Sequence, residues 1–464
     1  MKRILSIAFI ATTFLTPTFA SSSDLAAKLA KFHRVISSQT FDFEAKKSGD
    51  GYDVAIKPLV MPYKNLFKKD ATIHIKVDEG PLITSPSFGF GKAGLQASGA
   101  LADLLRSDIA NDIKKTFKDG IKYKLTGKVS FDDDLREHIE IEPLEYKGKD
   151  SVVKVSKSSF DIKGNLDEII PTTSGKIDYI KVLPNSKNEG FELNNFTFNS
   201  QATEPPLDGY IIFGKNHMEV EHFNFKAKAQ NQFLNIDGKI KIDGDIKKVS
   251  NKLCNFHIKE EVSTNNKDTI ALLKGVKRNL FELNLQNIGI EGFVGLMKLQ
   301  KEQEQIQEEL IKASKKNDDI AMQKAIVKLT ELNNKLVPIY NSFMISGKSR
   351  IIANLELESD KLSYIKVNLL YKAAPISGDI SSAFILLAAQ GLAIFDGDIE
   401  AKVDGTLANS INPMASLILG MLQSKGLITM KNGVYELKAK LKDGKIIINN
   451  KSYTLQELTA AILQ

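Results

Sequence analysis

The sequence predicts an α+β fold, mainly β, in which a long, curved and mostly antiparallel sheet is partly covered by helices and carries an inserted helical hairpin. Three observations predict this fold. Apolar and polar residues alternate through most of the 464 residues, as they do in a strand with one buried face. The dipeptide Asp-Gly, which suits tight hairpin turns, occurs eight times between such stretches. The chain has no sustained alternation of strands with helices, which a parallel sheet would need.

The alternation is clearest in residues 121–166. Within residues 121–131 the odd positions are mostly apolar, and the even positions carry lysine, threonine or serine. Asp132-Asp133-Asp134 interrupts this pattern, and residues 137–147 then run back with the same period. We therefore expect a hairpin here, followed by further strands over residues 153–162.

The first 20 residues have the pattern of a cleavable signal peptide. A basic start, Met1-Lys2-Arg3, precedes an uncharged apolar stretch that ends in the small residue Ala20. The alternative, an uncleaved membrane anchor, fits less well, because Pro17 and several threonines weaken a span that needs about 20 apolar residues. We expect an exported protein in the periplasm, and contact with a membrane surface remains open.

Charge and cysteine content agree with that location. Removing Lys2 and Arg3 lowers the formal net charge from +7 to +5, which is compatible with an anionic membrane surface but does not require one. The single cysteine, Cys254, cannot form an internal disulfide. An exported chain without disulfides is more typical of a bacterial periplasm than of a small disulfide-stapled extracellular domain.

After the signal peptide, 1–20, we expect three regions. Residues 21–290 form an N-terminal β-rich region with helices at about 24–36 and 100–117, each marked by a stripe of apolar residues. Residues 291–340 form the inserted helical hairpin, with a polar break at 314–319. Residues 341–464 form a C-terminal β-rich region with a terminal helix at 455–463 and a further apolar helix over 376–389. The hairpin is expected to cover the sheet; the alternative is an arm that binds a partner or lipid.

No arrangement of residues predicts chemistry. His217 and His222 are five apart on a predicted strand, so they point to opposite faces and chelate poorly. Cys254 is interpreted as a small core residue, and Asp132-Asp133-Asp134 as a solvated turn, not a calcium loop. The glycine-rich residues 89–94 lack the Lys-Ser/Thr ending of a phosphate loop. We therefore assign no catalytic residue, metal site or cofactor, do not expect an enzyme, and can name no ligand-binding residue.

Several short stretches resemble the YdgA-like family of bacterial envelope proteins. They are Gly-Pro-Leu at 80–82, Lys-Leu-Thr-Gly-Lys-Val-Ser-Phe at 124–131, Ile-Glu-Pro-Leu-Glu-Tyr-Lys-Gly at 141–148, and the ending Leu-Lys-Asp-Gly-Lys-Ile-Ile-Ile-Asn-Asn-Lys at 441–451. Members of that family usually carry a histidine before the Gly-Pro step, where this chain has Glu79. The resemblance implies an exported, β-rich protein without an established activity, and it supplies no catalytic residues.

These observations lead to one preferred function and two alternatives. A broad sheet with one apolar face needs cover, and the few predicted helices are too short to supply all of it. We expect a non-enzymatic envelope protein that binds a lipid or another hydrophobic ligand on this face. The alternatives are a structural or dimerising scaffold, and a hydrolase acting on envelope material. The expected partners are a hydrophobic ligand, a membrane surface or a second copy; export makes nucleic acid an unlikely target.

Overall fold

The computed structural model describes residues 23–37, 41–59, 63–79, 93–117, 119–147, 151–184, 189–207, 213–229, 232–376 and 391–463. The predicted signal peptide, the Gly-Pro-Leu motif, residues 89–92 of the glycine-rich stretch, and residues 377–389 of the predicted apolar helix lie outside these ranges. The chain divides into two compact units, residues 1–235 and residues 236–464. The divide falls within strand β13 (Gln232–Lys248).

In the described part of the first unit, the earliest element is helix α2 (Ser23–Ile36), which is followed by an antiparallel sheet. Ten strands pair in the order β1 (Phe41–Ser48), β2 (Gly51–Pro58), β3 (Thr72–Glu79), β4 (Ala93–Ala100), β5 (Lys122–Val129), β6 (Asp134–Ile141), β9 (Ser158–Asn165), β10 (Thr172–Pro184), β11 (Gly190–Ala202) and β12 (Gly214–Ala229). A hairpin of β7 (Leu144–Lys147) and β8 (Ser151–Val155) pairs with the second half of β10.

The core of the first unit lies between α2 and the sheet. Leu25, Leu29 and Phe32 of α2 are at most 1% exposed, and they belong to one cluster with the inward residues of β1–β6 and β9. The apolar stripe of the helix therefore covers the apolar face that two-residue periodicity builds on the strands.

The helix predicted over residues 100–117 is divided in two. A short 3₁₀ turn, η2 (Leu101–Leu104), and helix α3 (Ser107–Thr116) are separated by the extended residue Leu105. Leu105 forms a β-bridge with Phe67, and the Arg106 amide donates to the Leu66 carbonyl at 2.9 Å. At this point, backbone hydrogen bonds to a neighbouring segment replace the helical ones. The helical spacing of the apolar residues could not predict this interruption.

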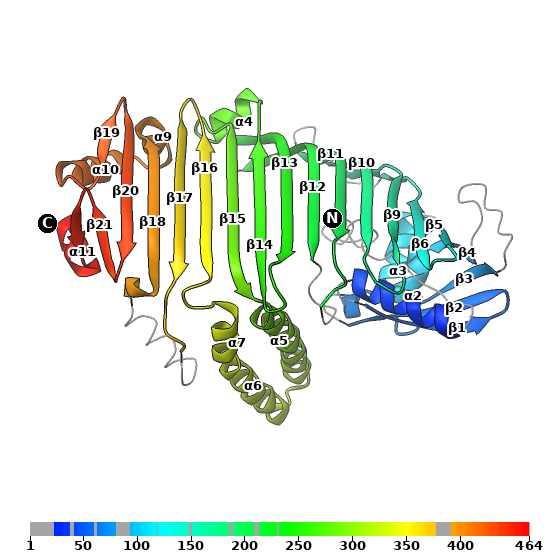
Figure 1. The fold of residues 1–464 in the computed structure, drawn as a ribbon. Coiled ribbons are helices and arrows are strands. Elements are labelled where there is room, and N and C mark those ends of the chain that lie inside the picture. Colours follow the sequence, from blue (N-terminus) through cyan, green and yellow to red (C-terminus); the bar gives the residue numbers. More distant parts are fainter. Residues whose placement is uncertain are drawn as a thin grey trace. The chain divides into compact units, whose positions relative to one another are not determined.

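The second unit is also an antiparallel meander, and its strands lie side by side in Figure 1. Its strands pair in the order β13, β14 (Leu253–Ser263), β15 (Arg278–Gly289), β16 (Arg350–Glu358), β17 (Leu362–Tyr371), β18 (Phe395–Asp404), β20 (Val434–Lys442), β21 (Lys445–Ile448) and β22 (Lys451–Tyr453), with the short β19 (Thr429–Lys431) also on β20. The predicted α+β fold with mostly antiparallel strands is confirmed.

The Asp-Gly pairs occur both in hairpin turns and inside strands. Asp443-Gly444 forms a hairpin turn between β20 and β21, with φ of 52° and 76°. Two left-handed residues in succession match the twist of an antiparallel hairpin. By contrast, Asp237-Gly238 and Asp243-Gly244, for which the sequence allowed either a turn or a strand, both lie inside β13.

Three helices, not two, form the insertion between β15 and β16. They are α5 (Ile290–Lys316), α6 (Asp319–Asn334) and α7 (Leu336–Phe343). Asn317, with φ of 51°, ends α5, and the Asp318 carboxylate accepts a hydrogen bond from the Ala321 amide to begin α6. Together they form an arm at one end of the strands (Figure 1). Pro338 lies in the first turn of α7, where a missing amide proton costs nothing, and does not end the helical region.

Among the described residues of the second unit, four further helices occur: α4 (Lys267–Leu272), α9 (Gly405–Ile411), α10 (Ala415–Ser424) and α11 (Leu455–Leu463). α4 and α9 lie at the end of the strands opposite the arm (Figure 1). Within the described residues, no helix combines the length and the apolarity that crossing a bilayer requires.

Candidate functional site

The sheet of the second unit has one apolar face. Antiparallel pairing places Phe281 of β15 opposite Leu355 of β16, and Leu355 opposite Ile365 of β17. Because directly paired residues point to the same side of a sheet, these side chains form a row across three strands. The next two rows on the same face, on the side toward the arm, contain further aliphatic residues: Leu283, Leu285, Ile351, Ala353, Val367, Leu369 and Ile399.

This apolar face is incompletely covered. Phe281 and Leu355 are each 38% exposed, and Ile365 is 45% exposed. Near the arm, the face is covered by an aromatic cluster in which the ring of Phe293 lies 6.4 Å from that of Phe256 and 6.2 Å from that of Phe343. Near β20–β22 it is covered by Leu422 of α10 and Leu458 of α11, which pack with Ala439 and Ile448. The row Phe281, Leu355 and Ile365 lies between these two covered areas.

The opposite face of the same sheet is polar and ion-paired. His257 Nε2 lies 2.8 Å from Glu282 Oε1, and Arg278 lies within 3.5 Å of carboxylate oxygens of three glutamates on both neighbouring strands, Glu261, Glu356 and Glu358. The hydrogen bond from Arg278 to Glu358 raises the pKa of the guanidinium, which therefore stays charged. This face is suited to water, so the sheet is amphipathic and an apolar ligand would have only one side to bind.

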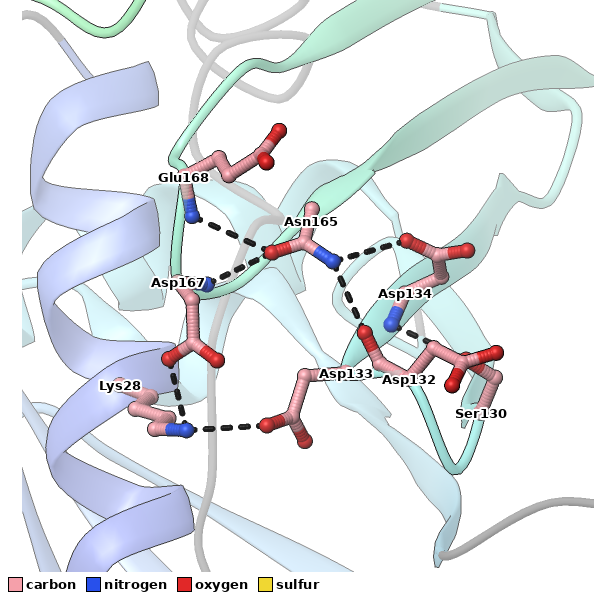
Figure 2. Close-up of polar contacts among 8 residues, drawn as sticks. All are labelled: Lys28, Ser130, Asp132, Asp133, Asp134, Asn165, Asp167 and Glu168. Carbon is pink, nitrogen blue, oxygen red and sulfur yellow. Dashed lines mark hydrogen bonds and ion pairs between the residues drawn. The ribbon is translucent and has the colours of Figure 1, made fainter.

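A second feature, in the first unit, fastens α2 to the sheet through a polar clamp (Figure 2). Lys28 Nζ lies 2.9 Å from Asp133 Oδ2 and 2.7 Å from Asp167 Oδ1. The hydrogen bonds that Lys28 donates to both carboxylates raise its pKa well above the usual range. Asn165 joins the two loops, because its side-chain amide donates to the Asp132 carbonyl at 2.8 Å and its oxygen accepts from the Asp167 amide at 3.0 Å. The clamp thus links the helix, the β5–β6 turn and the turn after β9.

Asp133 departs from the prediction of a solvated turn. The residues Asp132-Asp133-Asp134 do form the turn between β5 and β6, but Asp133 is only 9% exposed and has a left-handed φ of 61°. Its carboxylate is turned inward to Lys28 because α2 packs directly beside it. Only the tertiary arrangement brings residue 28 to residue 133.

Beneath the same helix lies a buried ionisable pair that the sequence analysis missed. His33 Nε2 of α2 lies 3.1 Å from Glu137 Oε2 of β6, and neither side chain is exposed to solvent. The His33 ring lies 5.6 Å from that of Phe32 and 6.4 Å from that of Phe43. In the part of the chain that the structure describes, none of the four side-chain polar atoms of His33 and Glu137 makes a hydrogen bond, so the pair is held at ion-pair distance without hydrogen-bond geometry. No substrate can reach atoms enclosed in this way, so we interpret the pair as structural.

The remaining histidines are dispersed in pairs with neighbouring side chains. His74 contacts Asp53 at 2.8 Å, and His138 contacts Asp161 at 2.9 Å. His217 Nε2 lies 3.5 Å from Glu219, whereas His222 contacts Asn194 at 3.0 Å, so these two histidines use different partners. Among the residues whose positions are described, no group of three or more His, Cys, Asp or Glu could hold a metal ion.

Cys254 is fully buried, as its interpretation as a small core residue predicts. Burial raises the pKa of its thiol to about 11. At pH 8 only about one chain in a thousand then carries Cys254 as the reactive thiolate. We expect a thiol-specific chromogenic reagent at pH 8 to label the native protein very slowly and to label one thiol per chain at once in denaturant. Labelling of the native protein at the rate of the denatured protein would contradict this assignment.

A model of one protein family matches residues 68–456 of the chain; the family is described as a bacterial protein of unknown function, DUF945. No curated protein and no solved structure matches the chain. The family match spans the greater part of both compact units and includes the uncovered row Phe281, Leu355 and Ile365 as well as Glu137. The chain therefore belongs to DUF945, a bacterial family of unknown function.

Proposed function

We propose that the protein is an exported, non-enzymatic envelope protein that binds the acyl chains of a lipid on the apolar face of its second unit. The uncovered row Phe281, Leu355 and Ile365 is the observation that carries the proposal. Large aliphatic and aromatic side chains in direct cross-strand contact form a flat apolar surface, and such surfaces on soluble proteins usually mark binding sites. Each buried methylene of an acyl chain would contribute about 0.8 kcal/mol.

Other features support the location in the envelope. The first 20 residues have the pattern of a signal peptide, the single cysteine suits a periplasmic protein, and several motifs resemble YdgA-like envelope proteins. Lipids are abundant hydrophobic molecules in that compartment. An acyl chain fits the three side chains of the row, which are uncharged, and the exposed carboxylate of Glu260 on β14, which pairs with Phe281, marks the edge of this apolar surface.

The test compares two leucines on opposite faces of the same sheet. Leu355 of β16 lies in the uncovered row, whereas Leu362 of β17, which pairs with Glu358, lies on the polar face at a similar exposure of 42%. The protein is purified gently from the bacterial envelope, and the lipid bound per chain is measured by mass spectrometry. We expect stoichiometric lipid on the unaltered protein and on Leu362→Glu, but at least about tenfold less on Leu355→Glu, because a carboxylate cannot be desolvated against an acyl chain at low cost.

Two outcomes would contradict the proposal. Equal lipid on both variants would show that the uncovered row does not hold it. Absence of lipid, together with a dimer in light scattering that Leu355→Glu converts to a monomer, would instead support the scaffold alternative, in which a second copy covers the face.

A further inference from the structure

Helix α10 is apolar on two faces, but only one of them is covered. Its ten residues carry no charge. The inner face contributes Leu422 to the cluster of Leu427, Ala439 and Ile448. The outer face, with the α9–α10 connection, presents side chains at the spacing of one helical stripe, and we call these residues the α10 patch: Ile411 (59% exposed), Met414 (56%), Leu417 (57%), Ile418 (48%) and Met421 (39%).

The α10 patch is continuous in the fold with further exposed leucines. The hydroxyl of Ser410 in α9 donates to the Leu407 carbonyl at 2.8 Å, and its Oγ also lies 3.3 Å from the Lys274 carbonyl, which places α9 beside the turn after α4. Leu272 and Leu273, which end α4, are 37% and 41% exposed. Figure 1 shows α4 and α9 at the same end of the strands, opposite the arm. Exposed apolar side chains are therefore present on α4 and α9 as well as on α10.

The segment that carries the α10 patch has charges of one sign, and acidic side chains lie at its two borders, Asp404 at the N-cap of α9 and Glu436 of β20 beside β19. Residues 405–435 contain no aspartate or glutamate, and they contain two lysines, Lys425 just after α10 and Lys431 on β19. Lys274 adds a third positive charge beside α9. A twofold contact between two copies of this surface would bring these lysines toward one another. An anionic partner matches the lysines better.

We propose that the α10 patch docks the second unit onto the surface of a bilayer that contains anionic lipid. A ten-residue helix is about 15 Å long, too short to span the apolar core of a membrane, so it would lie in the plane of the interface. Met414, Leu417, Ile418 and Met421 enter the boundary between headgroups and acyl chains, and the lysines contact lipid phosphates. The inference does not depend on lipid binding at the uncovered row of the sheet.

The chain offers a direct optical test because it contains no tryptophan. Leu417→Trp introduces a single fluorophore on the α10 patch, and Ile326→Trp introduces one on α6, at a comparably exposed position (54%) outside the patch. The full-length proteins are mixed with vesicles of about three parts phosphatidylcholine to one part phosphatidylglycerol. We expect the emission of Leu417→Trp to shift to the blue and to be quenched by brominated acyl chains, while that of Ile326→Trp stays unchanged.

A second pair of variants measures affinity by co-sedimentation with the same vesicles. Two double variants each replace two adjacent exposed aliphatic residues. They are Leu417→Asn/Ile418→Asn on the α10 patch and, as the matched control, Ile326→Asn/Val327→Asn on α6. We expect the first double variant to bind at least about tenfold more weakly than the unaltered protein, and the second to bind equally well. Binding should also weaken at least about tenfold on pure phosphatidylcholine and should fall with added salt.

Several results would overturn the proposal: no vesicle binding by the unaltered protein, binding that does not depend on phosphatidylglycerol, or an unshifted Leu417→Trp emission on vesicles that do bind the protein. A dimer that Leu417→Asn/Ile418→Asn dissociates, without vesicle binding, would assign the patch to self-association. The proposal of lipid binding on the sheet and the proposal of membrane docking by the α10 patch can be tested independently. Leu355→Glu alters the lipid site on the sheet and leaves the α10 patch unchanged. If the asparagine variant does not fold, the tryptophan emission still decides.

Discussion

Replacing Glu137 with leucine is expected to lower the free energy of unfolding of the first unit by about 3 kcal/mol. Glu137 and His33 are both enclosed beneath α2, with 3.1 Å between Nε2 and Oε2. Removing one partner leaves the other polar side chain in an apolar core among Phe32 and Phe43 without compensation. The measurement is urea unfolding followed by circular dichroism, with hydrogen exchange in α2 to locate the loss.

The same strand supplies the control. Glu140 of β6 points to the other face, where it contacts His138 at 3.4 Å and Lys157, and it is partly exposed. Glu140→Leu should change the stability much less than Glu137→Leu, because water can solvate the partners it leaves. The double variant His33→Leu/Glu137→Leu should return to within about 1 kcal/mol of the unaltered protein. Additive losses in the double variant would show that the two side chains do not act as a pair.

The second large effect is expected at Gly292, near the start of α5. An added Cβ at this position would lie 2.2 Å from the Phe343 backbone nitrogen and 2.4 Å from its Cα, so α5 and α7 touch backbone to backbone. Alanine normally stabilises a helix interior relative to glycine by about 1 kcal/mol. Here we expect Gly292→Ala to destabilise the second unit by about 3 kcal/mol, because α7 must move away from α5.

Gly420 is the matched control for this substitution. It lies inside α10, and an added Cβ would meet no atom within 4 Å. Gly420→Ala should therefore stabilise the protein slightly, so the two substitutions should have opposite signs in urea unfolding. A stabilising Gly292→Ala would refute the close packing of α5 on α7.

Much of the fold was predictable because it depends on local periodicity. In β5, for example, Tyr123, Leu125 and Val129 are buried and Lys122 and Lys124 are exposed, as alternation predicts. The limits of α11 agree with the prediction to the residue. The third helix of the arm was missed because a proline after an apolar helical stretch predicts a helix end, whereas Pro338 lies in the first turn of α7, where it is tolerated.

The buried pair left one detectable signal. In β6, the buried face is formed by Leu135, Ile139 and Ile141. Glu137 also has an odd residue number, so its side chain points to the same face. A carboxylate in that register needs a buried partner, which is a prediction the sequence analysis could have made. It could not have named His33, because 104 positions separate the two residues and only the docking of α2 brings them together.

The sequence by itself determined the alternating strands, most of the helices and the presence of one apolar face, because side-chain direction along a strand follows from local backbone geometry. The tertiary structure alone decided which part of that face stays open and which helix face lacks cover. Exposure at Phe281, Leu355, Ile365 and the α10 patch depends on where α5, α7, α10 and α11 come to rest, and those positions arise from contacts between residues far apart in the chain.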